Sequence, residues 1–200
     1  MPLVKAHIVL TVRERMEWII AFLLSLWLVY NADWIVAPAG FASYDLTPRT
    51  AWGLLGIVTM PFLHRSLGHL LADTLALAVL LPLLAIRYEE FRLIMLRLVL
   101  LNGALLWIVG WPVPHVGAQS LAIAVVAFLY FSAPIRWPMM SRLAALSMIV
   151  CYCLFVILGG IGQAFQVDFW DGQLCGLAAG VFWGHRFTGL EQSERWKRSM

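Results

Sequence analysis

Charged residues are scarce in this sequence. Only 12% of its 200 residues are Asp, Glu, Lys or Arg, and 62% are hydrophobic, whereas a soluble globular domain carries about 25% charged residues. The mean hydropathy is accordingly high, at +0.84. This shortage of charge excludes an ordinary soluble globular protein and indicates a protein that spans a membrane several times.

Cysteine is also rare, and long polar segments are missing. The cysteines are odd in number, lie within apolar stretches and show no CxxC spacing: Cys151, Cys153 and Cys175. We expect buried thiols rather than a disulfide, and we expect neither a metal nor another cofactor. The short polar ends leave no room for a soluble domain. The first apolar run is too long for the core of a secretory signal, and no A-x-A-like site follows it, so we expect it to remain as a helix.

Apolar runs of about 20 residues are what the sequence has in abundance, and a helix of that length crosses a hydrocarbon layer about 30 Å thick. We predict an all-α membrane protein with six transmembrane helices, at 17–36, 67–86, 91–111, 117–133, 142–161 and 171–187. The predicted domains are an N-terminal segment at 1–16, a membrane domain at 17–187 and a tail at 188–200. The long first outer loop, 37–67, is expected to be structured, partly embedded and packed on the bundle, because non-helical backbone at membrane depth requires protein or water around it.

Basic residues are distributed unevenly among the predicted loops. All Lys and Arg except Arg49 and Arg65 lie on one predicted side, which is the side of both chain ends. Since short loops rich in Lys and Arg remain in the cytoplasm, we expect both termini to be cytoplasmic. The net charge of +3 then follows from the topology, so no nucleic-acid partner is expected.

Ionisable residues gather at the start of the second predicted span, where they are functional candidates by default. His69 and Asp73 are four residues apart and share one helix face, so they can pair or point into one cavity. If the helix included His64, that residue would lie about 140° around it from His69, a poor arrangement for chelation. A zinc site from these three residues is therefore not expected. The structural alternative is an interfacial His64 beside a His69–Asp73 pair.

Small residues mark the fourth and sixth predicted spans. Gly117 and Ala118 open the fourth span and permit close approach to a helix N-terminus, where free N–H groups favour an anion. The sixth span carries a G-x-x-x-G-x-x-x-G face that suits a closely packed neighbouring helix, formed by Gly172, Gly176 and Gly180. A weaker interpretation of that face is homodimerisation. Asn102 in the third span is expected to hydrogen-bond between helices.

These residues resemble the rhomboid family of intramembrane serine proteases. The family's second helix carries H-x-x-x-x-H-x-x-x-N, and "HRSLGHLLAD" supplies His64, His69 and Asp73. Its fourth helix begins G-x-S-G and its sixth carries H-x-x-G-x-x-x-G, and the matches cover 46–184. The resemblance implies a six-helix rhomboid-like bundle with a Ser–His dyad below the membrane surface. The stretch from Thr47 onward looks like a bacterial branch, which implies the bacterial inner membrane.

The departures from the family affect the dyad itself. Aligning "HVGAQSL" with a typical "HIGASGL" places Gln119 at the nucleophile, and aligning "WDGQLCGLAAG" with "WEGHLFGFLAG" places Gln173 at the catalytic histidine. The family's asparagine is Asp73 here. A primary amide is neither a useful nucleophile nor a general base, so no intact catalytic dyad is expected. The two glutamines are expected to hydrogen-bond each other, while an oxyanion-side pocket is retained: His64, His69, Asp73, Gly117 and Ala118.

Three functions compete on this evidence. The leading hypothesis is a pseudoprotease that binds transmembrane segments of client membrane proteins through a lateral opening beside 142–161, without cutting them. The enzyme alternative is a protease that uses Ser120 with a displaced base, although a shift of one residue rotates the side chain by about 100°. His115 in a loop and His185 near the cytoplasmic end of the last span are badly placed as bases, which leaves a Ser120–His69 arrangement as the conceivable one. A small transporter or channel is the third class, and the lack of visible repeats stands against it. The oligomeric state is left open.

Overall fold

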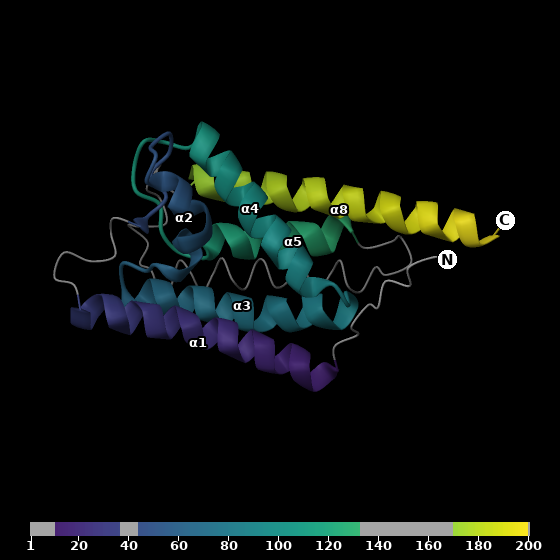
Figure 1. Ribbon diagram of the computed structural model, residues 1–200, viewed down its shortest axis with the longest axis horizontal. Coiled ribbons are helices and arrows are strands. Elements are labelled where there is room, and N and C mark those ends of the chain that lie inside the picture. Colours follow the sequence, from purple (N-terminus) through teal and green to yellow (C-terminus); the bar gives the residue numbers. More distant parts are fainter. Residues whose placement is uncertain (1–10, 37–43, 133–169, 200) are drawn as a thin grey trace, which may run out of the picture.

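The computed structural model describes residues 11–36, 44–132 and 170–199. Helices dominate these segments, in the order α1 (Val12–Val36), α2 (Gly53–Thr59), the 3₁₀ turn η2 (Met60–Phe62), α3 (Leu67–Arg87), α4 (Phe91–Val109), α5 (Gln119–Phe131) and α8 (Trp170–Ser199). Apart from an isolated bridge between Leu46 and His115, the described segments contain no strand pairing. The prediction of an all-α protein holds over these residues (Figure 1).

Three of the described helices are long and apolar enough to cross a membrane: Val12–Ile35, Leu67–Arg87 and Phe91–Val109. They correspond to the spans predicted at 17–36, 67–86 and 91–111. α3 and α4 are joined by a short turn that begins at Tyr88, which has extended backbone angles and ends α3. The periodic apolar runs therefore located the spans correctly, although α1 begins five residues earlier than predicted, at Val12.

The other predicted spans differ from the described helices. α5 has 13 residues and is about 20 Å long at 1.5 Å per residue, which is shorter than a full span. It begins at Gln119 rather than at 117, because Gly117 has a φ of 102° and cannot belong to a right-handed helix. α8 has 30 residues and continues to Ser199, past the predicted end at 187. The span predicted at 142–161, with Cys151, Cys153 and the lateral opening, lies outside the described residues.

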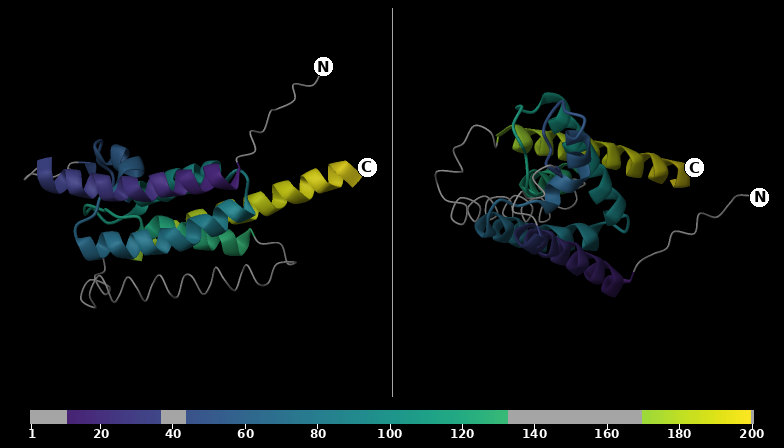
Figure 2. Two further views of the ribbon diagram at one scale, coloured as in Figure 1. Left: turned by 90° about the horizontal axis from the view of Figure 1, so that it is seen from below. Right: turned by 60° about the vertical axis from the view of Figure 1, so that its left-hand side comes forward.

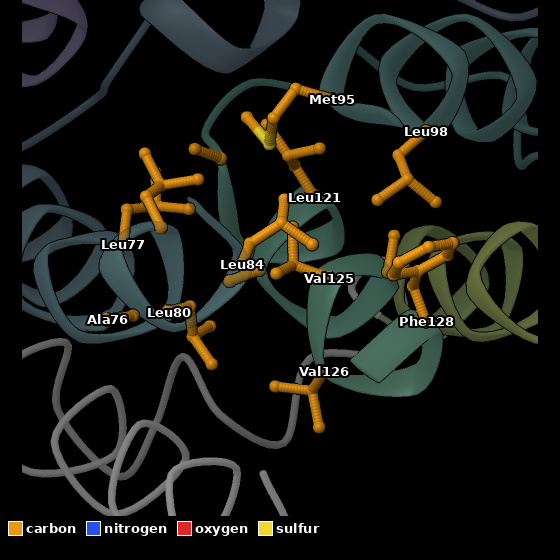
Figure 3. Close-up of a cluster of buried hydrophobic side chains, with 14 of the residues drawn as sticks. Ala76, Leu77, Leu80, Leu84, Met95, Leu98, Leu121, Val125, Val126 and Phe128 are labelled. Atoms are coloured by element: carbon orange, nitrogen blue, oxygen red, sulfur yellow. The ribbon is translucent and has the colours of Figure 1, made fainter. Parts of the chain in front are cut away.

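One apolar core joins α1, α3, α4 and α5. Its centre consists of fully buried side chains contributed by α3, α4 and α5, such as Leu80, Leu98, Leu121 and Phe128. Figure 3 shows these side chains pointing toward one another from the three helices. Because the helices meet through interlocking apolar side chains, the polar groups at their ends are held in fixed positions.

α8 packs on α5 through glycines. A Cβ atom added at Gly176 would overlap the backbone oxygen of Ser120, and one added at Gly180 would overlap that of Ala124. The two backbones therefore approach as closely as helices can, which is the role of small residues in membrane bundles. The predicted glycine face thus packs within the chain, so homodimerisation is not needed to explain it.

The segment between α1 and α3 is structured where it is described, from residue 44 onward. The Leu46 and His115 backbones exchange two hydrogen bonds, of 3.1 and 3.0 Å, and the Trp107 indole donates to the Thr50 carbonyl at 2.9 Å. α2 packs on α4 where a Cβ added at Gly103 would lie 2.8 Å from the Ile57 side chain. The prediction of a loop packed on the bundle is confirmed for these residues.

The two ends of the bundle differ in charge. The start of α1, the end of α3 and the start of α4 meet at one end, where Arg15 donates to the Ala85 carbonyl at 2.6 Å and the Arg92 guanidinium lies 5.9 Å from the Trp18 ring centre. The last turns of α8 project beyond the other described helices at this same end (Figures 1 and 2). α2 and the polar residues preceding α3 lie at the opposite end, so the candidate site is remote from the basic end.

Candidate functional site

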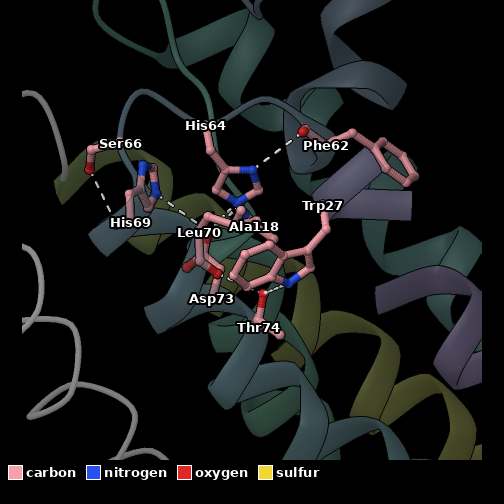
Figure 4. Close-up of polar contacts among 9 residues, drawn as sticks. All are labelled: Trp27, Phe62, His64, Ser66, His69, Leu70, Asp73, Thr74 and Ala118. Atoms are coloured by element: carbon pink, nitrogen blue, oxygen red, sulfur yellow. Dashed lines mark hydrogen bonds and ion pairs between the residues drawn. The ribbon is translucent and has the colours of Figure 1, made fainter. Parts of the chain in front are cut away.

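A single carboxylate organises the polar residues at the α2 end of the bundle. Asp73 on α3 is 2% exposed, and its Oδ2 atom lies 3.1 Å from His64 Nε2, 3.3 Å from His69 Nε2 and 2.6 Å from the backbone nitrogen of Ala118. Figure 4 shows both imidazole rings and the Ala118 backbone directed toward this side chain. Groups from three separate segments thus meet at one oxygen atom.

His64 reaches Asp73 because it is not part of a helix. Leu63 and Ser66 both have extended backbone angles, and α3 begins after Ser66 with the Ser66 hydroxyl accepting from the His69 N–H at 3.2 Å. The chain therefore folds back and brings the His64 ring over α3, where Nδ1 lies 3.3 Å from the Phe62 carbonyl. The angle of 140° around a helix does not apply. His64 is only 6% exposed and joins the His69–Asp73 pair, whereas the structural alternative placed it beside that pair.

His69 pairs with Asp73 as its spacing predicted, and its ring also lies against the backbone of Gly117. A Cβ atom at Gly117 would overlap the His69 ring, and the φ of 102° there is one that L side chains rarely adopt. The close approach expected at Gly117 is therefore real. What approaches the backbone is an imidazole ring from α3 rather than a neighbouring helix.

The N–H groups at the start of α5 are occupied within the protein. Gly117 donates to the Met60 carbonyl at 2.9 Å, and Ala118 donates to Asp73 at 2.6 Å. A helix N-terminus with its N–H groups attracts an anion, and here the protein supplies that anion from its own side chain. The expectation of free donors at these two positions is wrong, because a carboxylate on α3 already accepts one of them.

Ser120 lies in a different environment from the histidines. It is 8% exposed, and its Oγ accepts from Asn102 Nδ2 at 2.8 Å, which links α5 to α4. A Cβ atom added at Gly172 of α8 would lie 3.8 Å from the Cβ of Ser120. Within the described segments this amide is the one hydrogen-bond partner of the Ser120 side chain. The interhelical role predicted for Asn102 is thereby confirmed, and no histidine or carboxylate of segments 11–36, 44–132 and 170–188 hydrogen-bonds to the hydroxyl.

The two glutamines do not pair. Gln119 and Gln173 are both half-buried, and among the described residues no hydrogen bond joins them. α5 and α8 meet through Ser120 and Gly176, and Gln119, one residue before Ser120, lies about 100° around α5 from that contact. The glutamine–glutamine hydrogen bond that the sequence suggested is therefore not formed among the described residues.

A second His–Asp pair joins the α4–α5 connection to α8, and the sequence did not predict it. His115 Nε2 lies 3.4 Å from Asp171 Oδ2, and both side chains are about nine-tenths buried. The same carboxylate oxygen accepts from the Trp111 N–H at 2.7 Å. An acidic residue in the first turn of a helix is the signal that indicates such a contact. His185 lies near the middle of α8, with its ring 5.2 Å from Phe131.

The link between Asn102 and Ser120 gives a first testable expectation. Replacing Ser120 with alanine is expected to lower the free energy of unfolding by about 1 kcal/mol, because hydrogen bonds between helices in membrane bundles contribute about 0.6–1.7 kcal/mol. Unfolding in mixed micelles of Ser120→Ala, Asn102→Ala and the double variant measures the coupling. If the single effects are additive, the hydrogen bond does not contribute.

These features define an integral membrane protein: a helix bundle with apolar, membrane-length helices and a buried cluster of two histidines and one carboxylate at one end. The family model for the rhomboid domain matches residues 50–189, and the chain belongs to the rhomboid family. The matched region contains His64, His69, Asp73, α4, α5 and most of α8. The resemblance proposed from the sequence motifs is thus confirmed at the level of the family.

Mycobacterial proteins are among the relatives of this chain. Uncharacterized proteins of Mycobacterium bovis and Mycobacterium tuberculosis are 29% identical to it over 160 residues, which is 75% of this chain and 66% of theirs. One from Mycobacterium leprae is 29% identical over 159 residues, covering 71% of this chain and 59% of its own length. The chain thus spans about two thirds of the length of these relatives or less. No solved structure matches the chain.

Proposed function

We propose that this chain is a rhomboid-like pseudoprotease, which binds the transmembrane segments of client membrane proteins without cleaving them. The observation that carries the proposal is the hydrogen bond of 2.6 Å from Ala118 to Asp73. A protease of this class must offer backbone N–H groups to the anion that forms on the attacked carbonyl. Here a carboxylate already lies at that helix N-terminus, and its negative charge would repel a second anion.

The surroundings of the hydroxyl and imidazole groups support the same proposal. Nucleophilic catalysis by serine requires a base within about 2.6–3.2 Å of the hydroxyl, whereas Ser120 is bonded to the Asn102 amide. His64 and His69 are both directed at Asp73, and His115 is directed at Asp171. By the family's motif, the nucleophile and base positions hold Gln119 and Gln173, whose amides perform neither role.

The proposal includes an orientation. We place the basic end of the bundle in the cytoplasm of a bacterial cell, with the membrane domain at 17–187 and both chain ends on that side, because twelve of the basic residues lie there by sequence and such residues favour the cytoplasmic face. The Asp73 cluster then lies toward the outer face of the inner membrane.

Client binding can be tested by site-specific crosslinking in liposomes. Leu75 is 44% exposed and lies on α3 two residues after Asp73, and Leu96 is 51% exposed on α4 and serves as the matched control. A photoreactive residue at Leu75 is expected to capture transmembrane peptides at least fivefold more than one at Leu96, because clients bind beside the polar cluster. Equal capture at both positions, or lipid adducts alone at Leu75, would contradict client binding there.

The competing function is a protease that uses Ser120. The Ser120→Ala variant distinguishes the two, because it removes the hydroxyl and leaves both glutamines in place. We expect the unmodified protein and this variant to be equally inert toward a transmembrane substrate. Cleavage that is lost in Ser120→Ala would favour the enzyme.

A further inference from the structure

Two adjoining hollows lie between α1 and the segment that precedes α3. The Asp73 carboxylate lines neither of them, although its partner His64 lines the second. The first is an apolar groove of about 500 Å³, lined by residues that include Leu28, Ala32, Phe62 and Leu63. The second is a polar cavity of about 340 Å³, lined by residues that include Leu63, Asp33, Asp45 and Arg65. Leu63 lines both, and α1 contributes consecutive residues, Ala32 to the groove and Asp33 to the cavity. The two hollows therefore adjoin at Leu63 and together offer an apolar part and a polar part.

The order of the two parts along α1 matches the depth profile of a membrane. The apolar, membrane-length part of α1 ends at Ile35, so Asp33 lies near the end of that span, where the polar head groups of lipids are found. Leu28 lies more than one helical turn deeper, where the hydrocarbon begins. An occupant of both hollows therefore has a polar end at the membrane surface and an apolar part within the hydrocarbon layer.

The volume of the groove argues against a transmembrane helix as the occupant. A helix about 10 Å across occupies about 400 Å³ per turn, so the groove of about 500 Å³ holds little more than one turn. A membrane-spanning segment has about 20 residues and therefore more than five turns. A single acyl chain is thinner and flexible, and it gains about 0.8 kcal/mol for each CH₂ group that it buries.

The charges in the polar cavity indicate the head group. Arg65 is held by a hydrogen bond to the Pro114 carbonyl at 2.5 Å, and a guanidinium binds phosphate oxygens well. Asp33 and Asp45 are half-buried carboxylates, and Thr47 holds Asp45 by a hydrogen bond of 2.7 Å. Carboxylates attract an ammonium group and repel a head group that carries only negative charge. The combination suits a head group with both a phosphate and an ammonium.

We propose that these two hollows together bind one phospholipid with an amine head group, such as phosphatidylethanolamine. One acyl chain lies in the groove against Leu28, Ala32 and Phe62, and the head group lies in the cavity with its phosphate toward Arg65 and its ammonium toward Asp33 and Asp45. The site is separate from client binding, and of the Asp73 cluster only His64 lines it, so it stands whether or not the protein cleaves its clients.

Photolabelling in nanodiscs tests this site directly. The protein is placed in phosphatidylcholine nanodiscs that contain phosphatidylethanolamine with a diazirine on one acyl chain, and the labelled peptides are mapped by mass spectrometry. We expect adducts to concentrate on the peptides around Leu28 and Phe62. Ala32→Trp fills the groove and is expected to reduce this labelling at least threefold, with a smaller reduction in Ala32→Leu. Ile20→Trp, on the exposed surface of α1 at 56% exposure, is expected to leave it unchanged.

A comparison of two lipids tests the head-group assignment separately. Phosphatidylethanolamine is expected to label the groove at least threefold more than phosphatidylglycerol carrying the same diazirine. Asp45→Asn is expected to reduce that preference, whereas Arg65→Gln is expected to reduce labelling by both lipids, because both carry the phosphate. Equal labelling by the two lipids in the unmodified protein would overturn the head-group assignment. Adducts spread along all exposed residues of α1 and unaffected by Ala32→Trp and Ala32→Leu would overturn the site. Preferential labelling of the groove by a photoreactive transmembrane peptide would assign the groove to clients instead.

Discussion

Replacing Asp73 with alanine is expected to lower the free energy of unfolding by about 3–5 kcal/mol, which is the usual effect of removing one partner from a buried charged cluster. In the native protein its Oδ2 atom accepts from the Ala118 N–H and contacts the rings of His64 and His69. Without it, these groups remain buried and have lost their common acceptor. Unfolding in mixed detergent micelles, followed by tryptophan fluorescence or circular dichroism, measures the change.

Two further variants show whether the charge or the shape of Asp73 is responsible for its contribution to the free energy of unfolding. Asp73→Asn keeps an acceptor oxygen in the same place, so we expect a smaller loss, of about 1–2 kcal/mol, typical of replacing a charged hydrogen-bond partner by a neutral one. Glu17→Ala removes an exposed carboxylate that is paired with Arg13, and exposed pairs contribute little, so its stability should be unchanged. An Asp73→Ala variant as stable as the Glu17→Ala control would contradict the central position of Asp73.

Replacing Gly176 with valine is expected to separate α8 from α5 and to lower the free energy of unfolding by about 3 kcal/mol or more. The Cβ atom would overlap the Ser120 backbone oxygen, and a backbone atom cannot move aside as a flexible side chain can. Inserting bulk into a close-packed contact usually costs about 1–3 kcal/mol, and valine adds two methyl groups beyond the Cβ. Gly176→Ala is expected to show the same effect with a smaller magnitude.

The same helix face contains a matched control for this prediction. A Cβ at Gly172 would have its nearest neighbours at 3.8 Å, which is ordinary van der Waals distance. Gly172→Ala, one helical turn before Gly176, should therefore unfold like the unmodified protein or slightly later, because alanine favours the helical conformation more than glycine. Equal destabilisation by both substitutions would show that helix propensity, and not the close contact with α5, determines the effect.

The sequence predicted those features of the structure that depend on local periodicity. Apolar runs located α1, α3 and α4, and the spacing of four residues predicted the pair His69–Asp73 and the face formed by Gly176 and Gly180. Each of these follows from the 3.6-residue repeat of one helix. The family was predicted from motifs at the starts of the second, fourth and sixth predicted spans.

The features that the sequence did not predict depend on irregular backbone or on contacts between distant segments. His64 was judged to be poorly arranged to share a site with His69, but the extended backbone before α3 brings it to Asp73. Gln119 and Gln173 were expected to hydrogen-bond each other, and among the described residues no hydrogen bond joins them. His115 and Asp171 are 56 residues apart in the sequence, and their pairing depends on how the α4–α5 connection folds over the start of α8.

The central claim is that the catalytic chemistry has been lost from a rhomboid scaffold, and restoring it is the most direct test. Cleavage of a transmembrane substrate in liposomes is measured for the unmodified protein, for Gln119→Ser with Gln173→His, and for this pair combined with Asp73→Asn. Our account predicts no cleavage by the unmodified protein and the highest activity in the triple variant, because Asp73→Asn removes the carboxylate charge beside Ala118. Cleavage by the unmodified protein that disappears in Ser120→Ala would contradict the account.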